Sequence, residues 1–468
     1  MAEGQRRAHI LVIPYPAQGH MLPLLDLASL LSDRFRLVVT VAVTQGNLHL
    51  LSPLLSRSPA VSPLVLSFPD NSSLPQGLEN TMFLSPPQFG LLYHALGGLH
   101  GPILRWARAH PDPPDAVLSD LFVGWTARLA AELGVPRLVF SPSGAFALAV
   151  MNSLWRRMPQ RSDVDDPNEL VAFPSLPGSP VFRWCELSTL WRSYKRGDPV
   201  SEFIREGMLA NLGSWGLVVN TFSDLEGTYL DHLRNEDLGN PRVWAVGPLA
   251  PSGGSASAVE RGGPVSVLAE KVAAWLDDCE EGSVVYVAFG TQAMLSPPAA
   301  AALAAGLERS GARFVWAARA GTAVPEVFEE RTAGRGLVIR GWAPQVTILG
   351  HPAVGSFVTH CGWNSVMEAA AAGVALLAWP MGADQFTNAQ LVVEAGVGVR
   401  VCEGGPSSVP DPDELARAVA ESVGEPGRER RERAKAMGTR TTEATTEGGS
   451  SHKDLEELVG ELSKLVTM

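Results

Sequence analysis

Cysteine is scarce in this chain of 468 residues, which limits how the chain can be cross-linked or hold a metal. The four cysteines, Cys185, Cys279, Cys361 and Cys402, are widely spaced, with no Cys-x-x-Cys pair and no neighbouring pair of histidines. This pattern favours reduced thiols in a cytoplasmic protein over a disulfide framework or a zinc site.

The chain also lacks an apolar run long enough to cross a membrane. The longest candidate, 369–383, has 15 residues interrupted by Gly373, Pro380 and Gly382, whereas a membrane span needs about 20 residues. The N-terminus superficially resembles a signal peptide, but its apolar run is too short and fits a strand better. The sequence therefore predicts a cytoplasmic protein without a membrane span.

Positive charge is sparse as well. The net charge is −12, and no run of lysine and arginine is long enough to form a nucleic-acid-binding surface. Residues 428–433 mix both signs, which is typical of a solvated helix face. With 46% hydrophobic and 18% charged residues, the composition is that of an ordinary folded protein, and the length predicts two domains.

Apolar runs alternate with helix-like segments along the chain, which predicts an α/β fold with parallel sheets. The expected strands are 10–13, 37–43, 116–118, 137–140 and 217–219 in the first half, and 284–289, 313–318, 336–339, 355–359 and 375–379 in the second. No Gly-x-Gly-x-x-Gly follows the first strand of either half, and no acidic residue is placed to bind an adenosine ribose. Both absences argue against an oxidoreductase.

A segment of small and flexible residues within 248–263 predicts an exposed linker between two domains. We expect Rossmann-like domains at 1–247 and 264–450, followed by an amphipathic C-terminal helix at 451–468. Two such domains would leave a ligand-binding cleft at the carboxyl ends of both sheets. Residues 152–210 lack clear periodicity, which in a compact α/β domain is typical of a binding loop or lid.

The most informative stretch is 342–385, WAPQVTILGHPAVGSFVTHCGWNSVMEAAAAGVALLAWPMGADQ. Trp342 offers a flat face for a base, and stacking of a base on an aromatic ring contributes about 1–3 kcal/mol. The strand 355–359 leads through His360-Cys-Gly-Trp-Asn-Ser365 into a helix that Gly373 is expected to end. A glycine-containing turn before a helix N-terminus offers N–H groups and a positive dipole to an anion. These parts suit a nucleotide that carries a diphosphate and a sugar.

Each part of this stretch also has a purely structural explanation. Ser365-x-x-Glu368 has the form of a capping box, in which both side chains satisfy helix N–H groups and bind nothing else. His360 would then be an ordinary polar residue at a strand end, and Asp384-Gln385 a solvated loop.

The stretch closely resembles the 44-residue signature box of the plant UDP-sugar-dependent glycosyltransferases, glycosyltransferase family 1. The resemblance runs nearly end to end and includes 220–226, 243–248 and 284–291. It implies the GT-B fold, with two Rossmann-like domains facing each other across a cleft and the C-terminal helix packing back on the N-terminal domain. One departure is Ala375, where the family usually has proline, at a strand entrance that contacts no ligand in the family.

The resemblance also implies roles for the residues of a UDP-sugar site. Trp342 and Gln345 would hold uracil, with Ala343 between them, and Glu368 would hold the ribose hydroxyls. His360, Asn364, Ser365 and Thr291 would hold the diphosphate, and Trp363, Asp384 and Gln385 the sugar. The UDP-sugar is a co-substrate, and no cofactor is implied.

A histidine at the start of a predicted helix is the candidate catalytic base. Strand 10–13 leads into Pro14-Tyr-Pro-Ala-Gln-Gly-His20, and a helix is expected over 21–31 with Pro23 in its first turn. A lone histidine here is commonly a structural cap. Glycosyl transfer, however, needs a base to activate a poorly nucleophilic hydroxyl, and a positioned base contributes about 10²–10⁴-fold. The helix N-terminus disfavours imidazolium, so the base stays able to accept a proton.

A neutral histidine needs a partner that fixes its tautomer and stabilises the cation formed during the reaction, and a carboxylate does both. Asp120, just after the short strand 116–118, would lie at the carboxyl edge of the same sheet as His20. A strand-end turn residue is the simpler explanation for it. In the resembled family these two positions form the catalytic dyad.

Metal-dependent glycosyltransferases stabilise the leaving diphosphate with a divalent ion held by Asp-x-Asp, and this chain contains Asp163-Val-Asp165. The segment is rich in proline and arginine and has no flanking apolar strand, which favours a solvated loop. The helix dipole at Asn364-Ser365, with His360 and Thr291, would replace the metal. No metal site is therefore predicted.

The predicted reaction is the inverting, metal-independent transfer of a sugar from a UDP-sugar to a hydroxyl of a small aromatic metabolite such as a flavonoid or phenol. By the resemblance, Gln385 favours glucose, whereas histidine there often accompanies galactose. Alternatives are UDP-rhamnose, UDP-xylose or UDP-galactose as donor, a terpenoid or hormone as acceptor, or a UDP-sugar-binding protein without turnover.

An apolar acceptor pocket near the base is expected in the N-terminal domain, although core packing would explain each aromatic residue singly. Its predicted members are Gly19, Phe83, Phe89, Phe122, Phe146 and Trp184, with Phe386 from the second domain. The protein is expected to act as a monomer on small molecules, without binding nucleic acid.

Overall fold

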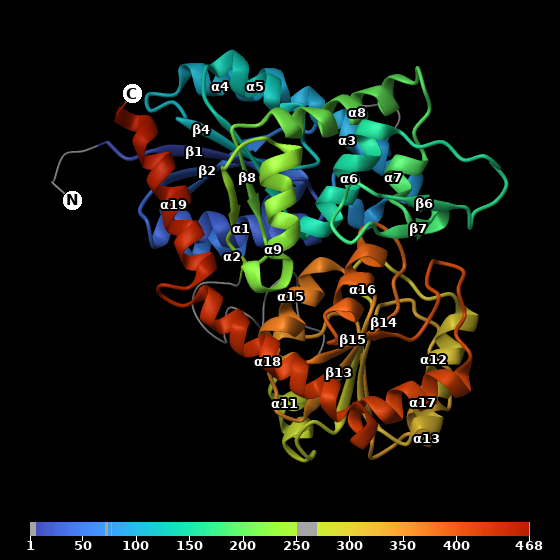
Figure 1. Ribbon diagram of the computed structural model, residues 1–468. Coiled ribbons are helices and arrows are strands. Elements are labelled where there is room, and N and C mark those ends of the chain that lie inside the picture. Colours follow the sequence, from blue (N-terminus) through green and yellow to red (C-terminus); the bar gives the residue numbers. More distant parts are fainter. Residues whose placement is uncertain (1–5, 71–73, 76, 250–268, 468) are drawn as a thin grey trace. The chain divides into compact units, whose positions relative to one another are not determined.

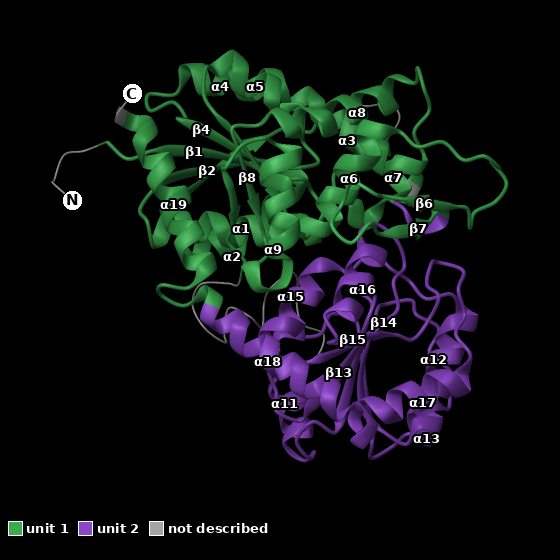
Figure 2. Cartoon of the chain, viewed as in Figure 1, with its two compact units in different colours: residues 1–184, 188–252, 444–468 green, residues 185–187, 253–443 purple. Residues whose placement is uncertain are grey.

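The computed structural model describes residues 6–70, 74–75, 77–249 and 269–467 (Figure 1). The chain divides into two compact units (Figure 2). Unit 1 comprises Met1–Trp184, Ser188–Ser252 and Ala444–Met468, and unit 2 comprises Cys185–Leu187 and Gly253–Glu443. From residue 250 onward, the linker predicted at 248–263 lies outside the described residues.

In the described part of unit 1, seven parallel strands form one sheet in the order β3-β2-β1-β4-β5-β8-β9. They are β1 (His9–Ile13), β2 (Val38–Thr44), β3 (Val61–Leu66), β4 (Ala116–Asp120), β5 (Arg137–Ser141), β8 (Gly216–Val219) and β9 (Val243–Ala245). A separate antiparallel hairpin joins β6 (Leu170–Ala172) to β7 (Val181–Arg183).

Helices cover both faces of this sheet, because its central strands β1, β4 and β5 are buried at every position. In β1, Ile10 and Val12 belong to a core shared with α1 and α19, whereas Leu11 and Ile13 belong to a second core shared with α3, α4 and α5. Successive strand residues point to opposite faces, so such a strand must be buried on both sides. The helices of unit 1 are α1 (Gln18–Asp33), α2 (Ser52–Arg57), α3 (Phe89–Leu96), α4 (His100–Ala109), α5 (Thr126–Leu133), α6 (Ala145–Arg157), α7 (Thr189–Arg192), α8 (Pro199–Ala210), α9 (Ser223–His232) and α19 (Ser450–Lys464).

Unit 2 is built in the same way around a parallel sheet in the order β12-β11-β10-β13-β14-β15. Its strands are β10 (Val284–Ala288), β11 (Arg313–Ala318), β12 (Gly336–Arg340), β13 (Val354–Thr359), β14 (Ala375–Ala378) and β15 (Gly398–Arg400). Its helices are α11 (Ala269–Asp277), α12 (Pro297–Ser310), α13 (Phe328–Arg331), α14 (Gln345–Leu349), α15 (Trp363–Ala372), α16 (Gln385–Glu394) and α17 (Pro412–Val423), and α18 (Arg428–Thr445) runs to its boundary. As predicted, Gly373 ends α15 in the left-handed conformation.

All ten strands expected from the sequence are present within a few residues of their predicted ends. In the two parallel sheets, the sequence prediction missed β3, which contains Pro63 and has exposed positions, and the three-residue strands β9 and β15. It also missed the three-residue strands β6 and β7 of the hairpin. Proline at a sheet edge and very short strands both weaken the periodic signal.

The segment 152–210 is more regular than expected. It contains the end of α6, the β6–β7 hairpin, α7 and α8, and its aromatic residues Trp155, Phe173 and Trp191 are all buried. The expectation of an irregular segment was therefore wrong. Short helices and strands with different sequence periods give no single repeat that could be recognised. The C-terminal helix α19 places Leu455, Leu458 and Leu462 in a core of unit 1.

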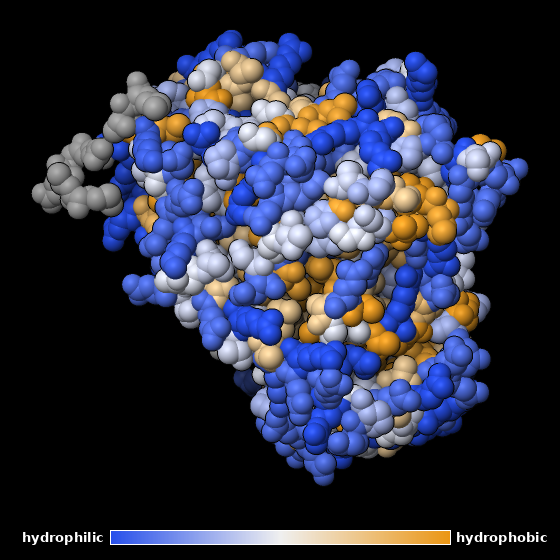
Figure 3. Space-filling view, viewed as in Figure 1, coloured by the Kyte–Doolittle hydropathy of each residue, from blue (hydrophilic) through white to orange (hydrophobic). Residues whose placement is uncertain are grey.

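On the face drawn in Figure 3, hydrophilic side chains cover most of the surface. Among the residues that the structure describes, the most exposed large apolar ones are Val164, Leu170 and Phe83, at 71%, 67% and 64%. Within the described parts of the chain, none of the helices has the length and apolar character needed to pass through a membrane.

Candidate active site

The candidate base lies where the first strand of unit 1 meets its first helix. β1 ends at Ile13, and α1 begins at Gln18, so His20 is the third residue of the helix. The predicted start at residue 21 was too late, and Pro23 lies in the second turn of α1. Because His20 is within the first turn, its ring is fixed near the positive end of a 16-residue helix.

Asp120 is the last residue of β4, which pairs in parallel with β1 so that Ser119 lies opposite Ile13. This register brings the two carboxyl ends together, and Asp120 Oδ2 lies 2.9 Å from His20 Nδ1. The Asp120 side chain is fully buried, and its Oδ1 accepts the Phe122 N–H at 2.8 Å. A buried carboxylate on Nδ1 fixes the proton there, so Nε2 is the nitrogen that can take a proton from a ligand.

Two aromatic rings surround the histidine. Phe122 lies 4.8 Å from the His20 ring and Tyr15 lies 5.3 Å from it, measured between ring centroids. Tyr15 was missed by the sequence prediction, although it stands in the loop between strand and helix that carries His20. Burial and the neighbouring Asp120 raise the pKa of the Tyr15 phenol, so it stays neutral beside the base.

The other residues predicted for an acceptor pocket have varied surroundings. Gly19 is exposed, and Phe83 lies in an exposed turn. Phe89 begins α3 and packs partly buried against a core of unit 1, while Phe146 is 1% exposed and stacks on Tyr229 at 4.3 Å. Trp184 packs between Arg161 and Trp191, and Phe386 of unit 2 lies under Arg400. Of this set, Phe122 is the residue whose ring contacts His20.

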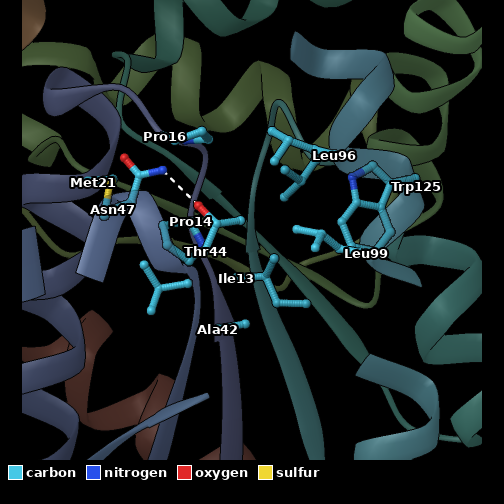
Figure 4. A pocket seen from close by; sticks show the side chains of 12 residues that line it. Ile13, Pro14, Pro16, Met21, Ala42, Thr44, Asn47, Leu96, Leu99 and Trp125 are labelled. Atoms are coloured by element: carbon cyan, nitrogen blue, oxygen red, sulfur yellow. Dashed lines mark hydrogen bonds between the residues drawn. The ribbon is translucent and has the colours of Figure 1, made fainter. Parts of the chain in front are cut away.

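A small cavity lies near the carboxyl ends of β1 and β2 in unit 1. Figure 4 shows hydrogen-bonded Thr44 and Asn47 on one side of it and Leu96, Leu99 and Trp125 on the other. Its volume of about 20 Å³ admits a water molecule but no aromatic ring. None of the predicted acceptor residues lines it, so it is not the expected acceptor pocket.

In unit 2, the His360 side chain packs against two turns, each of which contains a glycine. β10 and β13 are parallel neighbours, with Ala288 opposite Thr359, so the turns that follow both strands meet at one sheet edge. A Cβ atom on Gly290 would lie 2.6 Å from His360 Nε2, and one on Gly362 would lie 2.5 Å from it. The imidazole therefore fills the space that two missing side chains leave.

The His360 ring is neutral. Burial lowers its pKa to about 4, and among the described residues its buried Nδ1 has no hydrogen-bond partner. An unsatisfied buried polar atom beside a helix N-terminus indicates a position for a polar ligand. Cys361 next to it has a φ of 61°, a backbone conformation that is uncommon for a non-glycine residue and that clusters at functional sites.

Helix α15 begins at Trp363 with Gly362 as its N-cap, so no side chain caps it. The capping-box alternative for Ser365 and Glu368 is therefore wrong, because Ser365 is the third helical residue. Both side chains instead accept hydrogen bonds from Gln345 Nε2, at 3.0 Å for Ser365 Oγ and 2.7 Å for Glu368 Oε2. Residues predicted to hold uracil, ribose and phosphate are thus brought together by one amide.

The rest of the predicted donor site lies on the loops after other strands of the same sheet. Trp342 follows β12 and is half-buried, Ala343 is buried, and Thr291 follows Gly290 after β10. Trp363 is 4% exposed. Asp384 and Gln385 follow β14, where Ala375 stands at the strand entrance as expected.

Gln385 is oriented by its own loop. Its Oε1 accepts the N–H groups of Met381 at 2.8 Å and Gly382 at 3.0 Å, which leaves the amide N–H groups for a ligand. Asn388, which was missed, donates from Nδ2 to Cys361 O at 2.9 Å and so ties α16 to the turn after β13. Its position four residues after Asp384, on the same face of a helix, was the available signal.

The alternative metal motif forms a self-contained loop. Glu169 accepts the N–H groups of Ser162 and Asp163, and Asp163 Oδ1 accepts that of Asp165 at 2.9 Å. Within the described residues, histidine, cysteine and acidic side chains form no group of three that could hold a metal ion.

Comparison with known proteins shows the family to which the chain belongs. A family model described as UDP-glucoronosyl and UDP-glucosyl transferase matches residues 261–423. The chain is 50% identical to Flavonol 3-O-glucosyltransferase UGT89B1 of Arabidopsis thaliana, over 97% of this chain and 96% of that protein. It is 39% identical to Flavonol 7-O-rhamnosyltransferase of the same plant, over 98% of both chains.

Solved structures agree as well. The crystal structure of Arabidopsis thaliana UGT89C1 complexed with UDP-L-rhamnose is 38% identical, covers 98% of this chain and all of its own, and has a TM-score of 0.80. A structure of the same protein complexed with quercetin has a TM-score of 0.80 at 37% identity, with 98% of this chain and 100% of that chain covered. The chain therefore belongs to the plant UDP-sugar-dependent glycosyltransferases of glycosyltransferase family 1 and has their GT-B fold.

Proposed function

We propose that this UDP-glycosyltransferase transfers glucose from UDP-glucose to a hydroxyl of a flavonoid or similar phenol, with inversion at the anomeric carbon and without a metal or other cofactor. The observation that carries the chemistry is the 2.9 Å contact between His20 and the buried Asp120. A carboxylate in this position makes the imidazole a competent base at neutral pH.

In the proposed step, His20 Nε2 takes the proton of the acceptor hydroxyl as its oxygen attacks C1 of the sugar. The bond from that oxygen to C1 forms on the face opposite UDP while the bond from C1 to the diphosphate oxygen breaks, which inverts the anomeric carbon. UDP leaves with the bonding electron pair, and Asp120 stabilises the imidazolium that remains. The neutral His360 and the N-terminus of α15 stabilise the charge on the leaving diphosphate.

Glucose is favoured by the position of Gln385. Its amide N–H groups are oriented by the hydrogen bonds that Met381 and Gly382 donate to its oxygen, so they can donate to adjacent sugar hydroxyls, with Asp384 as the acceptor beside them. A glucosyltransferase is among the similar proteins, and so is a rhamnosyltransferase, which makes UDP-rhamnose the second candidate donor.

A flavonoid acceptor is supported by two observations. Similar proteins are flavonol glycosyltransferases, and one related structure contains quercetin. In this chain, Tyr15 and Phe122 present aromatic rings beside the base. Flat apolar surfaces favour a ring system without strong chemical discrimination, so several phenols are expected to react.

A donor panel tests this proposal. With quercetin as acceptor, UDP-glucose is expected to give a kcat/KM at least about tenfold above UDP-rhamnose, UDP-xylose and UDP-galactose, because about 1.4 kcal/mol of discrimination by the sugar contacts suffices for this. A tenfold preference for another donor would overturn the sugar assignment. Turnover of non-aromatic acceptors alone would overturn the acceptor class.

Chelation tests independence from a metal. Activity is expected to persist in EDTA, because His360 and the α15 N-terminus take the place of a divalent ion at the diphosphate. The measurement is the initial rate with and without EDTA, followed by addition of Mn²⁺ or Mg²⁺. A rate that falls on chelation and returns with the ion would restore Asp163-Val-Asp165 as a candidate metal site.

A further inference from the structure

Arg137 is a buried cation near the catalytic pair. It is the first residue of β5, beside β4, and is only 4% exposed. Its Nε donates to Ser119 Oγ at 3.0 Å and Thr126 Oγ1 at 2.8 Å, Nη1 donates to Ser214 Oγ at 2.9 Å, and Nη2 donates to Asn211 Oδ1 at 2.8 Å. All four acceptors are neutral, and among the described residues no carboxylate forms an ion pair with it.

A buried guanidinium without a contacting carboxylate is unusual, because burial disfavours a charge. Burial lowers the pKa of Arg137 to about 10, which still leaves it charged at neutral pH. The carboxylate of Asp120 acts in the opposite direction and raises the pKa of Arg137. Two buried charges of opposite sign thus stand on adjacent strands, and Asp120 offsets part of the burial cost of Arg137.

The hydrogen bonds of Arg137 also surround the loop that follows Asp120. Ser119 directly precedes Asp120, the Thr126 hydroxyl bonds to Val123 O at 2.7 Å, and Asn211 Nδ2 donates to Leu121 O at 2.8 Å. This loop carries Phe122, whose ring contacts His20 and whose N–H is bound by Asp120. The guanidinium therefore holds three points around the loop that carries Phe122.

We propose that Arg137 is a positioning residue of the glycosyl transfer reaction, which holds the loop after Asp120 and places a buried positive charge beside the strand that carries Asp120. The proposal rests on the function proposed above. Arg137 touches no substrate and acts through Asp120 and the loop.

The direction of the electrostatic effect follows from the groups near the pair. Besides Asp120 on β4 and Arg137 on β5, these are Tyr15 in the β1–α1 loop and Tyr93 on α3. Burial raises the pKa of both phenols, so they stay neutral. Of these four groups, Asp120 carries a negative charge and Arg137 a positive charge. Removing the positive charge makes the pair bind a proton more readily, so its titration moves to higher pH.

The test replaces Arg137 with the neutral methionine, which has a similar length. Titration of the His20 ring, followed by NMR in histidine-labelled protein, is expected to shift to higher pH by about one unit, a tenfold gain in proton affinity. The acidic limb of the kcat/KM profile should move in the same direction. Arg137→Lys keeps a positive charge, so the His20 titration should return toward that of the wild type. Its kcat/KM should stay below the wild-type value, because the forked hydrogen bonds of the guanidinium are lost.

Ser214→Ala is the matched control for a structural role. It removes one acceptor of Arg137 and no charge, so it should lower thermal stability and leave the His20 titration unchanged. If Arg137→Met does not fold, Arg137→Gln carries the same test, with folding of the whole chain checked by circular dichroism and thermal melting. An unshifted His20 titration in Arg137→Met overturns the inference. A shifted titration, combined with a wild-type protein that has no transferase activity, would overturn only the proposed function.

Discussion

Replacing His20 with alanine is expected to lower kcat/KM by about 10²–10⁴-fold, the usual contribution of a positioned general base. The affinity for UDP should stay at its wild-type value, because the predicted nucleotide contacts lie in unit 2 and His20 lies in unit 1. Initial rates with an acceptor of ordinary acidity measure the first effect, and calorimetric titration with UDP measures the second. A very acidic phenol would hide the loss, since it needs little help from a base.

Two variants complete this experiment. His49→Ala removes an exposed histidine of unit 1 and should leave the rate unchanged. Asp120→Asn keeps a side chain of the same shape but removes the charge that stabilises imidazolium, so its loss should be smaller than that of His20→Ala. A wild-type rate for His20→Ala would contradict the proposed mechanism, whatever rates the other two variants have.

Gly290→Ala is expected to lower kcat/KM for the UDP-sugar by about 10²-fold, the size of loss that follows when a binding group is misplaced by about 1 Å. The added Cβ would stand 2.6 Å from His360 Nε2 and 2.8 Å from Cε1, so the imidazole must move. The same ring nitrogen also lies against Gly362, where a Cβ atom would stand 2.5 Å from it. The displaced ring would no longer present its Nδ1 to the diphosphate.

Gly311→Ala separates this effect from backbone strain. Gly311 has a φ of 69°, close to the 70° of Gly290, and a Cβ there would meet nothing within 4 Å. Both variants therefore carry the cost of a left-handed alanine, about 1–2 kcal/mol, but only Gly290→Ala displaces His360. Thermal melting should show similar losses for the two variants, and UDP affinity should fall in Gly290→Ala alone. Equal UDP affinities would contradict a role for the His360 position.

The local sequence by itself determined the architecture of both halves. Strands such as Val284–Ala288 are buried on both faces, so their sequence is a continuous apolar run that can be recognised without knowledge of the neighbouring strands. The turn before α15 was also predictable, because glycine placement and helix termination are local properties. Strands with proline or with three residues lack this signal, which is why β3, β9 and β15 were missed.

The candidate site was predictable only as a set of residue types at strand ends. His20 and Asp120 are 100 positions apart, and their contact depends on β4 lying beside β1, which no local pattern encodes. The same holds for Gln345 at the start of α14, which donates a hydrogen bond to Glu368 of α15.

Tertiary packing alone decided which side chains act together. Phe122 and Phe146 are both aromatic residues near strand ends, yet one lies against the base and the other stacks on Tyr229 in the interior. Arg137 gave no signal in the sequence, since an arginine at a strand start is ordinarily solvated. Composition and periodicity report which face of an element is buried, whereas the sheet order and register set which buried or polar groups share that space.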